Sequence, residues 1–435
     1  METAVTVLFS VAGARRLDGT VRVPGDKSVS HRALIVGALA EGESTVRGLS
    51  DGHDVAATAA ALRAMGARVE GTTVSAGAGL HPPDGPLDAG NSGTTMRLLA
   101  GLVAGRPWAT ELTGDASLSG RPMDRVALPL RRMGAVVEGR GDRCLPPITV
   151  RGGALVGIDY ATPVPSAQVK SCVLLAGLAA AGETVVRETV VTRLHTEELL
   201  ARCGARITDE EGADGTHVVR LSPGPLAPFE LDVPGDPSQA AFWLVAACVV
   251  PDSRVTVPRL YVGRGRRGFL DVLTRMGAAI EEVPATGPGD LAATADVTAR
   301  WGPLDATVVH GAEITGLDEV PALAVAAACA RGDTVFHDVG ELRVKESDRL
   351  AGVAELVRSF GAGAEIDGDD LVVHGAARLT PGTVDARGDH RMAMAGAVAG
   401  LAAGEGTTRI SGWEAVATSY PRFADDLALL AGGGA

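Results

Sequence analysis

Aromatic side chains are scarce in this sequence of 435 residues, which contains 7 Phe, 4 Trp and 3 Tyr. Alanine, valine, leucine and 57 Gly dominate the composition instead. A core of small side chains favours helices that pack closely against sheets. The chain is longer than the size at which single hydrophobic cores stop growing, so we expect two domains.

The few cysteines form no recognisable pattern. They lie at positions 144, 172, 203, 248 and 329, and none belongs to a Cys-x-x-Cys or a Cys/His arrangement with metal-ligand spacing. An odd number of widely spaced cysteines is typical of a reduced protein without disulfides or structural zinc. We therefore expect a cytoplasmic protein with no metal site.

Basic runs and long apolar runs are also missing. The chain has 40 Lys and Arg against 53 Asp and Glu, a net charge of -13, which argues against nucleic acid or an anionic membrane as a partner. The longest apolar stretch, Met392–Gly404, is shorter than the roughly 20 residues of a membrane span. Residues 4–14 are apolar, but Glu2 precedes them and Arg15 and Arg16 follow them, the reverse of a secretory signal. We expect a first β-strand there.

The common nucleotide and hydrolase motifs are absent. There is no Gly-x-x-x-x-Gly-Lys-Ser/Thr, no Gly-x-Gly-x-x-Gly after a strand, no His-Glu-x-x-His and no Gly-x-Ser-x-Gly. The nearest match to a phosphate loop, Gly263-Arg-Gly-Arg-Arg-Gly268, lacks the Lys-Ser/Thr pair, and we expect an exposed turn.

What the chain does have is a loop that turns into a helix, Pro24-Gly-Asp-Lys-Ser-Val-Ser-His-Arg32, followed by an Ala- and Leu-rich run. Asp26 or Ser28 can cap this helix. Lys27, Ser28 and Arg32 then lie in or beside its first turn, where unpaired N–H groups and the helix dipole favour an anion. The alternative is a surface cap whose Lys and Arg are merely solvated.

The same pattern, a polar cluster that opens an apolar helix, recurs at intervals of roughly 70 residues. It begins at Ser28, Asn91, Ser166, Asp236, Glu319 and Asp389. A second marker, a glycine that ends a helix before a strand, keeps the same spacing at Gly66, Gly134, Gly204, Gly277 and Gly361. We infer six copies of one helix-strand-helix-strand unit, which divide naturally into three and three.

The second half starts with an echo of the first. Val233-Pro-Gly-Asp-Pro-Ser-Gln239 repeats Val23-Pro-Gly-Asp-Lys-Ser-Val29, but Pro237 stands where Lys27 stood. The second segment retains the Pro-Gly-Asp turn but lacks the positive charge. We therefore interpret residues 233–239 as structural.

Cations gather at the helix starts and their loops, and they imply more than one anionic ligand group. Arg121 lies just before a Pro that we expect to begin a helix over Met123–Met133, again a helix start suited to an anion. Near Arg349, two cations flank Glu346, although a salt-bridge cluster on a helix surface is an equal alternative. The candidate cations are Lys27, Arg32, Arg121, Arg193, Lys345, Arg349 and Arg391.

Four motifs in this order resemble the 5-enolpyruvylshikimate-3-phosphate synthases. They are Pro24–Arg32, the Gly-Asn-Ser-Gly-Thr-Thr-Met-Arg of 90–97, the Arg-Val-Lys-Glu-Ser-Asp-Arg of 343–349 and the Asp-His-Arg-Met-Ala-Met of 389–394. The resemblance implies an α/β (α+β) fold, a two-domain inside-out α/β barrel of six β-α-β-α-β-β repeats. One domain would comprise residues 1–21 and 233–435, the other residues 22–232, with the active site in the cleft between them.

The implied reaction belongs to the shikimate pathway of aromatic amino acid biosynthesis. It transfers the enolpyruvyl group of phosphoenolpyruvate to the 5-hydroxyl of shikimate 3-phosphate and releases phosphate, with no metal or organic cofactor. The partners would be these two small molecules, with no nucleic acid and no membrane, and we expect a monomer.

The resemblance also assigns residues. The shikimate 3-phosphate ligands would be Lys27, Ser28, Arg32, Ser166, Gln168, Arg193, Asp318 and Lys345. The phosphoenolpyruvate ligands would be Lys27, Asn91, Gly93, Arg121, Gln168, Arg349 and Arg391. The catalytic residues would be Asp318 as the base or hydroxyl-orienting group and Glu346 as the acid, together with Lys27.

Two departures from the family pattern point to its more divergent bacterial branch. Thr418 stands where many members have a Lys, and Glu341 stands where others carry Asn. Two alternatives stay open from the sequence. A UDP-N-acetylglucosamine enolpyruvyl transferase would have a reactive Cys in the loop at 114–121, which has none, and a catalytically silent repeat protein that binds a phosphorylated metabolite would leave Asp318 and Glu346 idle.

Overall fold

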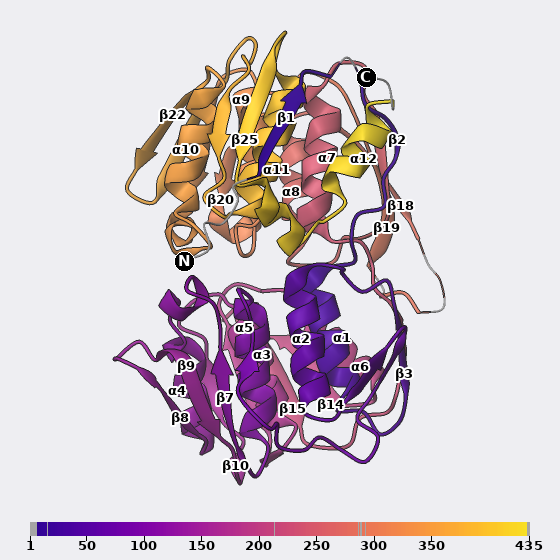
Figure 1. Cartoon of the computed structure of the whole chain (residues 1–435), viewed down its shortest axis with the longest axis vertical. Helices are drawn as coiled ribbons and strands as arrows, with labels where there is room; N and C mark the ends of the chain where they lie inside the picture. The colour runs from indigo at the N-terminus through magenta and orange to yellow at the C-terminus, as the bar shows by residue number, and fades with distance from the viewer. Residues whose placement is uncertain are drawn as a thin grey trace. The chain divides into compact units, whose positions relative to one another are not determined.

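The computed structural model describes residues 7–14, 16–212, 214–285, 287, 289–291 and 293–432. The chain divides into two compact units (Figure 1). The terminal unit contains Met1–Pro24, Pro234–Gly287 and Ala292–Ala435, and the middle unit contains Gly25–Val233 and Pro288–Leu291. Residues 4–6 of the expected first strand lie outside the described residues.

The middle unit has three four-stranded sheets with one topology. Their strand orders are β16-β3-β5-β4, β6-β7-β9-β8 and β11-β13-β15-β14, and in each the first pair is parallel and the others are antiparallel. β10 and β12 form a short parallel pair. The strands are β3 Ser44–Arg47, β4 Arg68–Glu70, β5 Thr73–Ser75, β6 Leu87–Asp88, β7 Ala109–Thr113, β8 Val136–Arg140, β9 Leu145–Arg151, β10 Leu155–Val156, β11 Asp159–Ala161, β12 Ala180–Ala181, β13 Thr184–Glu188, β14 Arg206–Glu211, β15 His217–Ser222 and β16 Glu230–Asp232.

In the terminal unit two described sheets have this four-stranded topology and a third has three strands. The sheets of this unit have the orders β18-β19-β17-β2, β20-β21-β23-β22 and β1-β25-β24, and β1 from the start of the chain lies beside β25 from its end (Figure 1). The strands are β1 Leu8–Ala12, β2 Asp18–Thr20, β17 Arg254–Tyr261, β18 Ala279–Pro284, β19 Thr294–Arg300, β20 Val308–His310, β21 Asp333–His337, β22 Gly363–Asp367, β23 Asp370–His374, β24 Thr383–Asp385 and β25 Thr407–Ser411.

Two strands explain how the chain crosses between units. Two parallel neighbouring strands need a crossover connection, and in this chain that connection usually contains one buried helix. β2 precedes the first buried helix in the chain yet pairs with β17 of the terminal unit, whereas β16 pairs with β3 of the middle unit. The chain therefore passes between the units at residues 24–25 and 233–234, and the short segment Pro288–Leu291 is assigned to the middle unit as well.

Each unit has three helices buried on nearly every side. In the middle unit these are α1 Lys27–Gly37, α3 Gly93–Ala104 and α5 Ala167–Gly177, accompanied by α2 His53–Ala64, α4 Asp124–Met133 and α6 His195–Arg202. In the terminal unit they are α7 Pro237–Val249, α9 Val320–Ala328 and α11 His390–Ala402, accompanied by α8 Gly268–Arg275, α10 Arg349–Ser359 and α12 Phe423–Leu430. Short 3-10 turns cover Leu118–Gly120, Gly311–Glu313, Gly340–Val344 and Trp413–Thr418.

Small residues permit this packing. A Cβ built on Gly101 of α3 would lie 2.3 Å from the carbonyl oxygen of Cys172 on α5, so the two helix backbones approach as closely as glycine allows. The scarcity of aromatic residues follows from the same design. Several of the few present stack together in the terminal unit, where Trp243 lies against Phe423 and donates to the hydroxyl of Tyr420.

The expected repeat markers are present. The six helix starts have caps at Asp26, Ser92, Ser166, Asp236, Glu319 and Asp389, within two residues of the expected positions. The five marker glycines have positive φ, which only glycine adopts without strain, and Gly134 is the left-handed C-cap of α4. The α/β fold class is confirmed.

One local expectation is confirmed and another is wrong. The helix expected over Met123–Met133 is present as Asp124–Met133 with Met123 as its N-cap, and the N–H groups of Met123 and Asp124 both donate to the carbonyl of Arg143. In the Gly263–Gly268 loop Arg266 is buried at 4% exposure rather than exposed. The reason is that Asp236 and Glu319, distant in sequence, supply its counter-charges.

Among the described residues no helix is long and apolar enough to cross a membrane.

Candidate active site

The N-terminal parts of α1, α3 and α5 lie close together in the middle unit, as hydrogen bonds between their side chains show. Arg32 of α1 donates to the hydroxyl of Ser171 on α5 over 2.6 Å, and Gln168 of α5 donates to the hydroxyl of Thr94 on α3 over 2.9 Å. Because the helices run side by side from these turns, their positive dipole ends point to the same region of the unit.

Arg32 is buried, with only 2% of its surface exposed, and its guanidinium is fixed by neutral groups. Nε donates to the hydroxyl of Thr196 over 2.7 Å, and Nη1 donates to the carbonyl of Ser28 over 2.9 Å. Ser28 in turn accepts from Nη1 of Arg193 over 2.9 Å. The structure therefore brings Ser28, Arg32 and Arg193 together, and it adds Thr196 and Ser171, which no sequence motif indicated.

Lys27 pairs with a carboxylate that the sequence analysis missed. Its ammonium lies 2.9 Å from Oδ2 of Asp54, and the two side chains are 14% and 11% exposed. Asp54 lies in the first turn of α2, where an acidic residue is favoured by the helix dipole and gives no sign of a functional role. Only its position opposite Lys27 could have identified it.

The start of α3 is lined by two guanidinium groups. Arg121 donates to Oδ1 of Asn91 over 2.7 Å, and Asn91 donates to Asp115 over 2.7 Å, so the loop that holds Arg121 is tied to the helix start. A Cβ on Gly93 would lie 3.2 Å from Nη1 of Arg97 and 3.7 Å from Nη1 of Arg121. Gly93 thus keeps the backbone bare beside both cations. Arg97, which donates to Gln168, was not among the expected cations.

Ser166 serves as the N-cap of α5, and its hydroxyl accepts from the N–H of Val169 over 3.4 Å.

A second cluster lies in the terminal unit around Arg349, which is fully buried. Its guanidinium donates to Asp389 over 2.7 Å, to Asp318 over 3.3 Å and to Glu346. Burial opposes the charge of Arg349, but these carboxylates outweigh it and raise the pKa of the guanidinium. Burial likewise disfavours the Asp389 carboxylate, yet Arg349 prevails and lowers its pKa. The cluster is an ion network, and Arg349 is not part of a helix-surface salt bridge.

The surroundings of Glu346 differ in part from the expectation of two flanking cations. Glu346 contacts Arg349, but the ammonium of Lys345 donates to the carbonyl of Gly316 over 2.8 Å. Burial lowers the pKa of Lys345 against the attraction of nearby carboxylates. Asp318 is shared between Arg349 and Arg391, whose Nη2 lies 3.4 Å from Oδ2.

The predicted residues therefore fall into two groups. The middle unit carries Lys27, Ser28, Arg32, Asn91, Gly93, Arg121, Ser166, Gln168 and Arg193. The terminal unit carries Asp318, Lys345, Glu346, Arg349 and Arg391. Within the described residues no group of three or more His, Cys, Asp or Glu side chains could hold a metal ion.

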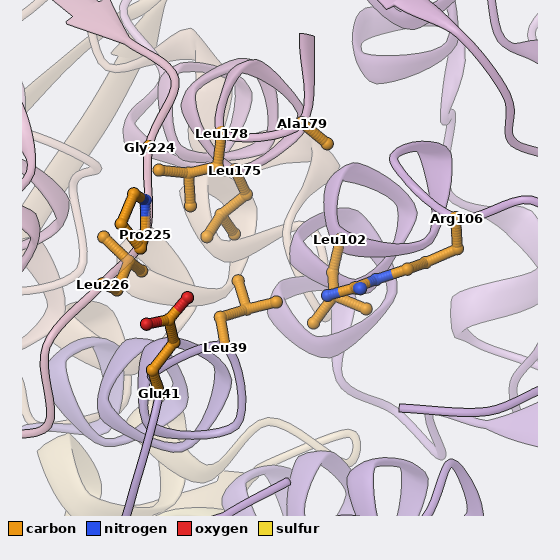
Figure 2. Close-up of a pocket in the computed structure, with 10 residues that line it drawn as sticks. All are labelled: Leu39, Glu41, Leu102, Arg106, Leu175, Leu178, Ala179, Gly224, Pro225 and Leu226. Carbon is orange, nitrogen blue, oxygen red and sulfur yellow. The ribbon is translucent and has the colours of Figure 1, made fainter. Parts of the chain in front are cut away.

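A pocket of about 180 Å³ lies elsewhere in the middle unit. Figure 2 shows it lined by leucines at the C-terminal ends of α1, α3 and α5, with Glu41 and Arg106 at its sides. Since the candidate residues lie at the N-terminal ends of the same helices, this pocket is separate from them.

Comparison with known proteins shows the family of the chain. The EPSP synthase (3-phosphoshikimate 1-carboxyvinyltransferase) family matches residues 11–427. The chain belongs to the EPSP synthase family. A 3-phosphoshikimate 1-carboxyvinyltransferase from Gloeobacter violaceus is 48% identical over 430 residues, which cover 97% of this chain and 98% of the relative. The one from Streptococcus uberis is 44% identical over 419 residues, covering 94% and 96%.

Solved structures agree with this assignment. An EPSP synthase from Acinetobacter baumannii superposes with a TM-score of 0.84 at 38% identity and covers 97% of this chain and 98% of its own. The enolpyruvyl transferase NikO from Streptomyces tendae superposes with a TM-score of 0.76 at 21% identity, covering 98% and 97%, and shares the fold.

Family membership confirms the expected reaction. As an EPSP synthase, the chain is a transferase of the shikimate pathway that moves the enolpyruvyl group of phosphoenolpyruvate to shikimate 3-phosphate. The two alternatives left open by the sequence find no support in the family match.

Proposed function

We propose that each of the two substrates is bound by its own set of the candidate residues. Shikimate 3-phosphate is bound by Ser28, Arg32, Ser166, Gln168 and Arg193 of the middle unit and by Asp318 and Lys345 of the terminal unit. Phosphoenolpyruvate is bound by Asn91, Gly93, Arg121, Gln168, Arg349 and Arg391, and Lys27 touches both substrates. The observation that carries this proposal is the meeting of three helix starts with several cations in the middle unit.

Physical chemistry supports the choice of these groups. Helix N-termini present free N–H groups and positive dipole ends, which bind phosphate and carboxylate. Guanidinium groups such as those of Arg121 and Arg193 suit both anions because they can donate two parallel hydrogen bonds. The ammonium of Lys27 is a compact point charge that pairs with Asp54. When a substrate competes with Asp54, this ammonium can approach the substrate oxygen on which negative charge develops.

The acid–base roles rest on two carboxylates in different surroundings. The addition needs one proton removed from the 5-hydroxyl and another delivered to the methylene carbon of phosphoenolpyruvate; phosphate then leaves, and a proton is lost from the new methyl group to restore the double bond. Asp318 contacts both Arg349 and Arg391, which favour its ionised form and suit a base. Glu346 is assigned as the acid, although its contact with Arg349 opposes protonation, so substrate burial must offset that effect.

Two matched arginine variants test the division of the substrates. Arg193 and Arg121 are both partly buried, and each donates to a polar side chain at a helix start, Ser28 and Asn91 respectively; Arg121 also donates to Ser117. Phosphate release from phosphoenolpyruvate and shikimate 3-phosphate, without added metal, gives the KM of each substrate. We expect Arg193→Met to raise mainly the KM for shikimate 3-phosphate and Arg121→Met mainly that for phosphoenolpyruvate. Equal changes in both constants would show that the division is wrong.

A third variant tests the acid. Glu346→Gln keeps the size of the side chain but cannot deliver the proton, so we expect kcat to fall by about 10²-fold while the KM values change little. A kcat near that of the unmodified enzyme, with both substrates still bound, removes Glu346 from this role.

We also propose that the enzyme is a cytoplasmic monomer with two domains, residues 1–21 with 233–435 and residues 22–232. The five cysteines are all free thiols, which supports a reducing compartment. Size-exclusion chromatography with light scattering tests the monomer, which should elute with a mass near 44.2 kDa.

A further inference from the structure

A chain of buried hydroxyl groups links three helices of the middle unit. Nδ1 of His31 on α1 lies 2.7 Å from the hydroxyl of Thr58 on α2, which lies 2.7 Å from the hydroxyl of Thr95 on α3. The Thr95 hydroxyl also lies 2.8 Å from that of Ser92, the N-cap of α3, and 3.2 Å from the backbone carbonyl of Asp54. All four side chains of this hydroxyl chain, His31, Thr58, Thr95 and Ser92, are at most 1% exposed.

The position of each link is what suggests a function. His31 follows Lys27 by four residues, Thr58 follows Asp54 by four, and Thr95 follows Asn91 by four. Residues four apart lie on the same face of a helix, one turn of about 5.4 Å along it. On α1 and α2 the hydroxyl chain therefore lies one turn behind Lys27 and Asp54, and on α3 it lies behind the loop that carries Asn91.

The hydroxyl chain is costly to interrupt. A threonine hydroxyl has one proton to donate and two lone pairs, so Thr58 can serve His31 and Thr95 at the same time. Burial lowers the pKa of His31 to about 3, and the ring is therefore neutral near pH 7 and able to accept or donate at Nδ1. With Thr58 removed, two buried polar atoms on two other helices lose a partner that water cannot replace.

We propose that Thr58, together with Thr95, is a positioning residue that holds the first turns of α1, α2 and α3 in the register that phosphoenolpyruvate requires. The inference rests on the proposed contacts of Lys27 and Asn91 with that substrate. Thr58 itself lies too deep to touch a ligand. Its effect passes through the backbone of the turn in front of it.

The residues proposed for shikimate 3-phosphate have a separate support. Thr196 on α6 lies 2.7 Å from the hydroxyl of Ser171, and both bond to the guanidinium of Arg32. This arrangement ties α1 to α5 and α6 without involving Thr58. The two threonines therefore offer a crossed test. Thr58, through Thr95, supports Asn91, which is proposed for phosphoenolpyruvate alone, and Thr196 supports Arg32, which is proposed for shikimate 3-phosphate alone. Lys27 is proposed for both substrates.

The test compares isosteric threonine-to-valine variants in the intact enzyme. We expect Thr58→Val to raise the KM for phosphoenolpyruvate about tenfold, since leaving a buried polar group unpaired costs about as much free energy as a tenfold change in an equilibrium constant. The KM for shikimate 3-phosphate should rise by a clearly smaller factor, because only Lys27 of its proposed ligands is also proposed for phosphoenolpyruvate at this turn. Thr196→Val is expected to do the reverse. Thr58→Ser, which keeps the hydroxyl, should restore the KM for phosphoenolpyruvate.

Thr110→Val is the matched control. Thr110 lies on β7 in the same unit at 2% exposure, and its hydroxyl has no hydrogen-bond partner among the described residues. Thr110→Val therefore makes the same change in volume and polarity as Thr58→Val but breaks no hydrogen bond. Melting temperatures of all variants show which of them fold. Because Thr58 and Thr95 act in one chain, the double valine variant should be little worse than either single variant.

Three results overturn the inference. They are unchanged constants in Thr58→Val, an equal rise of both KM values, and a lower melting temperature with no selective rise in KM. Lys27→Met separates this failure from failure of the proposed site. If Lys27→Met leaves the KM for phosphoenolpyruvate unchanged, the assignment of Lys27 is wrong, whereas a raised KM there with a normal Thr58→Val disproves the positioning role alone.

Discussion

The sequence Pro-Gly-Asp opens a buried helix twice, at α1 and at α7, and the two starts differ in what surrounds them. Both aspartates cap their helix, since Asp26 accepts from the N–H of Val29 and Asp236 from that of Ser238. At α1 the next residue is Lys27, which stays partly accessible beside Asp54. At α7 the next residue is Pro237, which has no charge to offer.

The cation at the start of α7 comes from another segment of the chain and is buried. Arg266 is buried and donates to Asp236 over 2.7 Å, to Glu319 over 3.1 Å and to Ser238 over 3.1 Å. Two carboxylates therefore balance the charge of this guanidinium, as three do around Arg349, where a ligand has to compete with Asp318 and Glu346. The comparison teaches that a capped helix start with a nearby cation is not by itself an anion site. Carboxylates that contact the cation determine how much of its charge is neutralised.

Neighbouring carboxylates test this difference most strongly. Asp318 faces Arg349 and Arg391, whereas Glu319 faces Arg266. We expect Asp318→Ala to lower kcat by about 10²- to 10⁴-fold, the range of acid–base groups, with a small change in melting temperature. Glu319→Gln should leave kcat within a few-fold. Steady-state phosphate release measures both, and similar losses of kcat in the two variants would contradict the distinction.

Removing the two cations should lower the stability by different amounts. Arg266→Met leaves Asp236 and Glu319 buried without their counter-charge, so we expect the free energy of unfolding to fall by about 3–5 kcal/mol. Lys27→Met removes the counter-charge of one less deeply buried carboxylate, Asp54, and should lower the free energy of unfolding by less than Arg266→Met does, while also lowering kcat/KM. Urea denaturation followed by circular dichroism compares them, and equal costs would mean that both cations are structural.

The next pair of helix starts differs in the size of the first residue. α3 begins with Gly93, whereas α9 begins with the buried Val320. A Cβ at Gly93 would approach Arg97 and Arg121, and the family resemblance suggests that glyphosate, slightly longer than phosphoenolpyruvate, fills this space. We expect glyphosate to inhibit the enzyme, and Gly93→Ala to weaken it about 10- to 200-fold more than the substrate.

Inhibition constants against phosphoenolpyruvate decide this prediction. Equal losses for both ligands would mean that the space is not shaped as argued. An unmodified enzyme that already resists glyphosate would instead direct attention to Thr418, which ends the 3-10 turn Trp413–Thr418.

The smallest expected effect concerns pH. Five residues after its capping Asp, α1 has the buried His31, where α7 has Ala241. Burial lowers the folded pKa of His31 to about 3, below its unfolded value, so the unfolded chain binds the extra proton and stability falls as the pH is lowered through 6.5. Between pH 7.5 and 5.5 this group should cost about 1 kcal/mol of unfolding free energy.

Urea denaturation at the two pH values measures this cost. His31→Gln should show a smaller loss of stability over the same interval. A loss as large in the variant as in the unmodified chain would assign the pH dependence to other groups.

Local features of the fold were predictable because they depend on neighbours in sequence. A cap bonds to an N–H group two or three residues ahead, as Asp26 does, and a glycine such as Gly134 adopts positive φ for reasons within its own turn. The spacing of these signals predicted six repeats, and the motifs predicted most of the residues at the helix starts.

Only tertiary structure decided which charges stay available. Arg266 was expected to be exposed, and its burial depends on Asp236 and Glu319, which lie tens of residues away in the chain. The contacts of Asp54 and Thr58 could not be predicted for the same reason, since each contacts a residue on another helix. The sequence by itself determined where helices begin and which of them carry cations. Packing determined which cations are neutralised, because Coulombic and hydrogen-bond partners are chosen by distance in space.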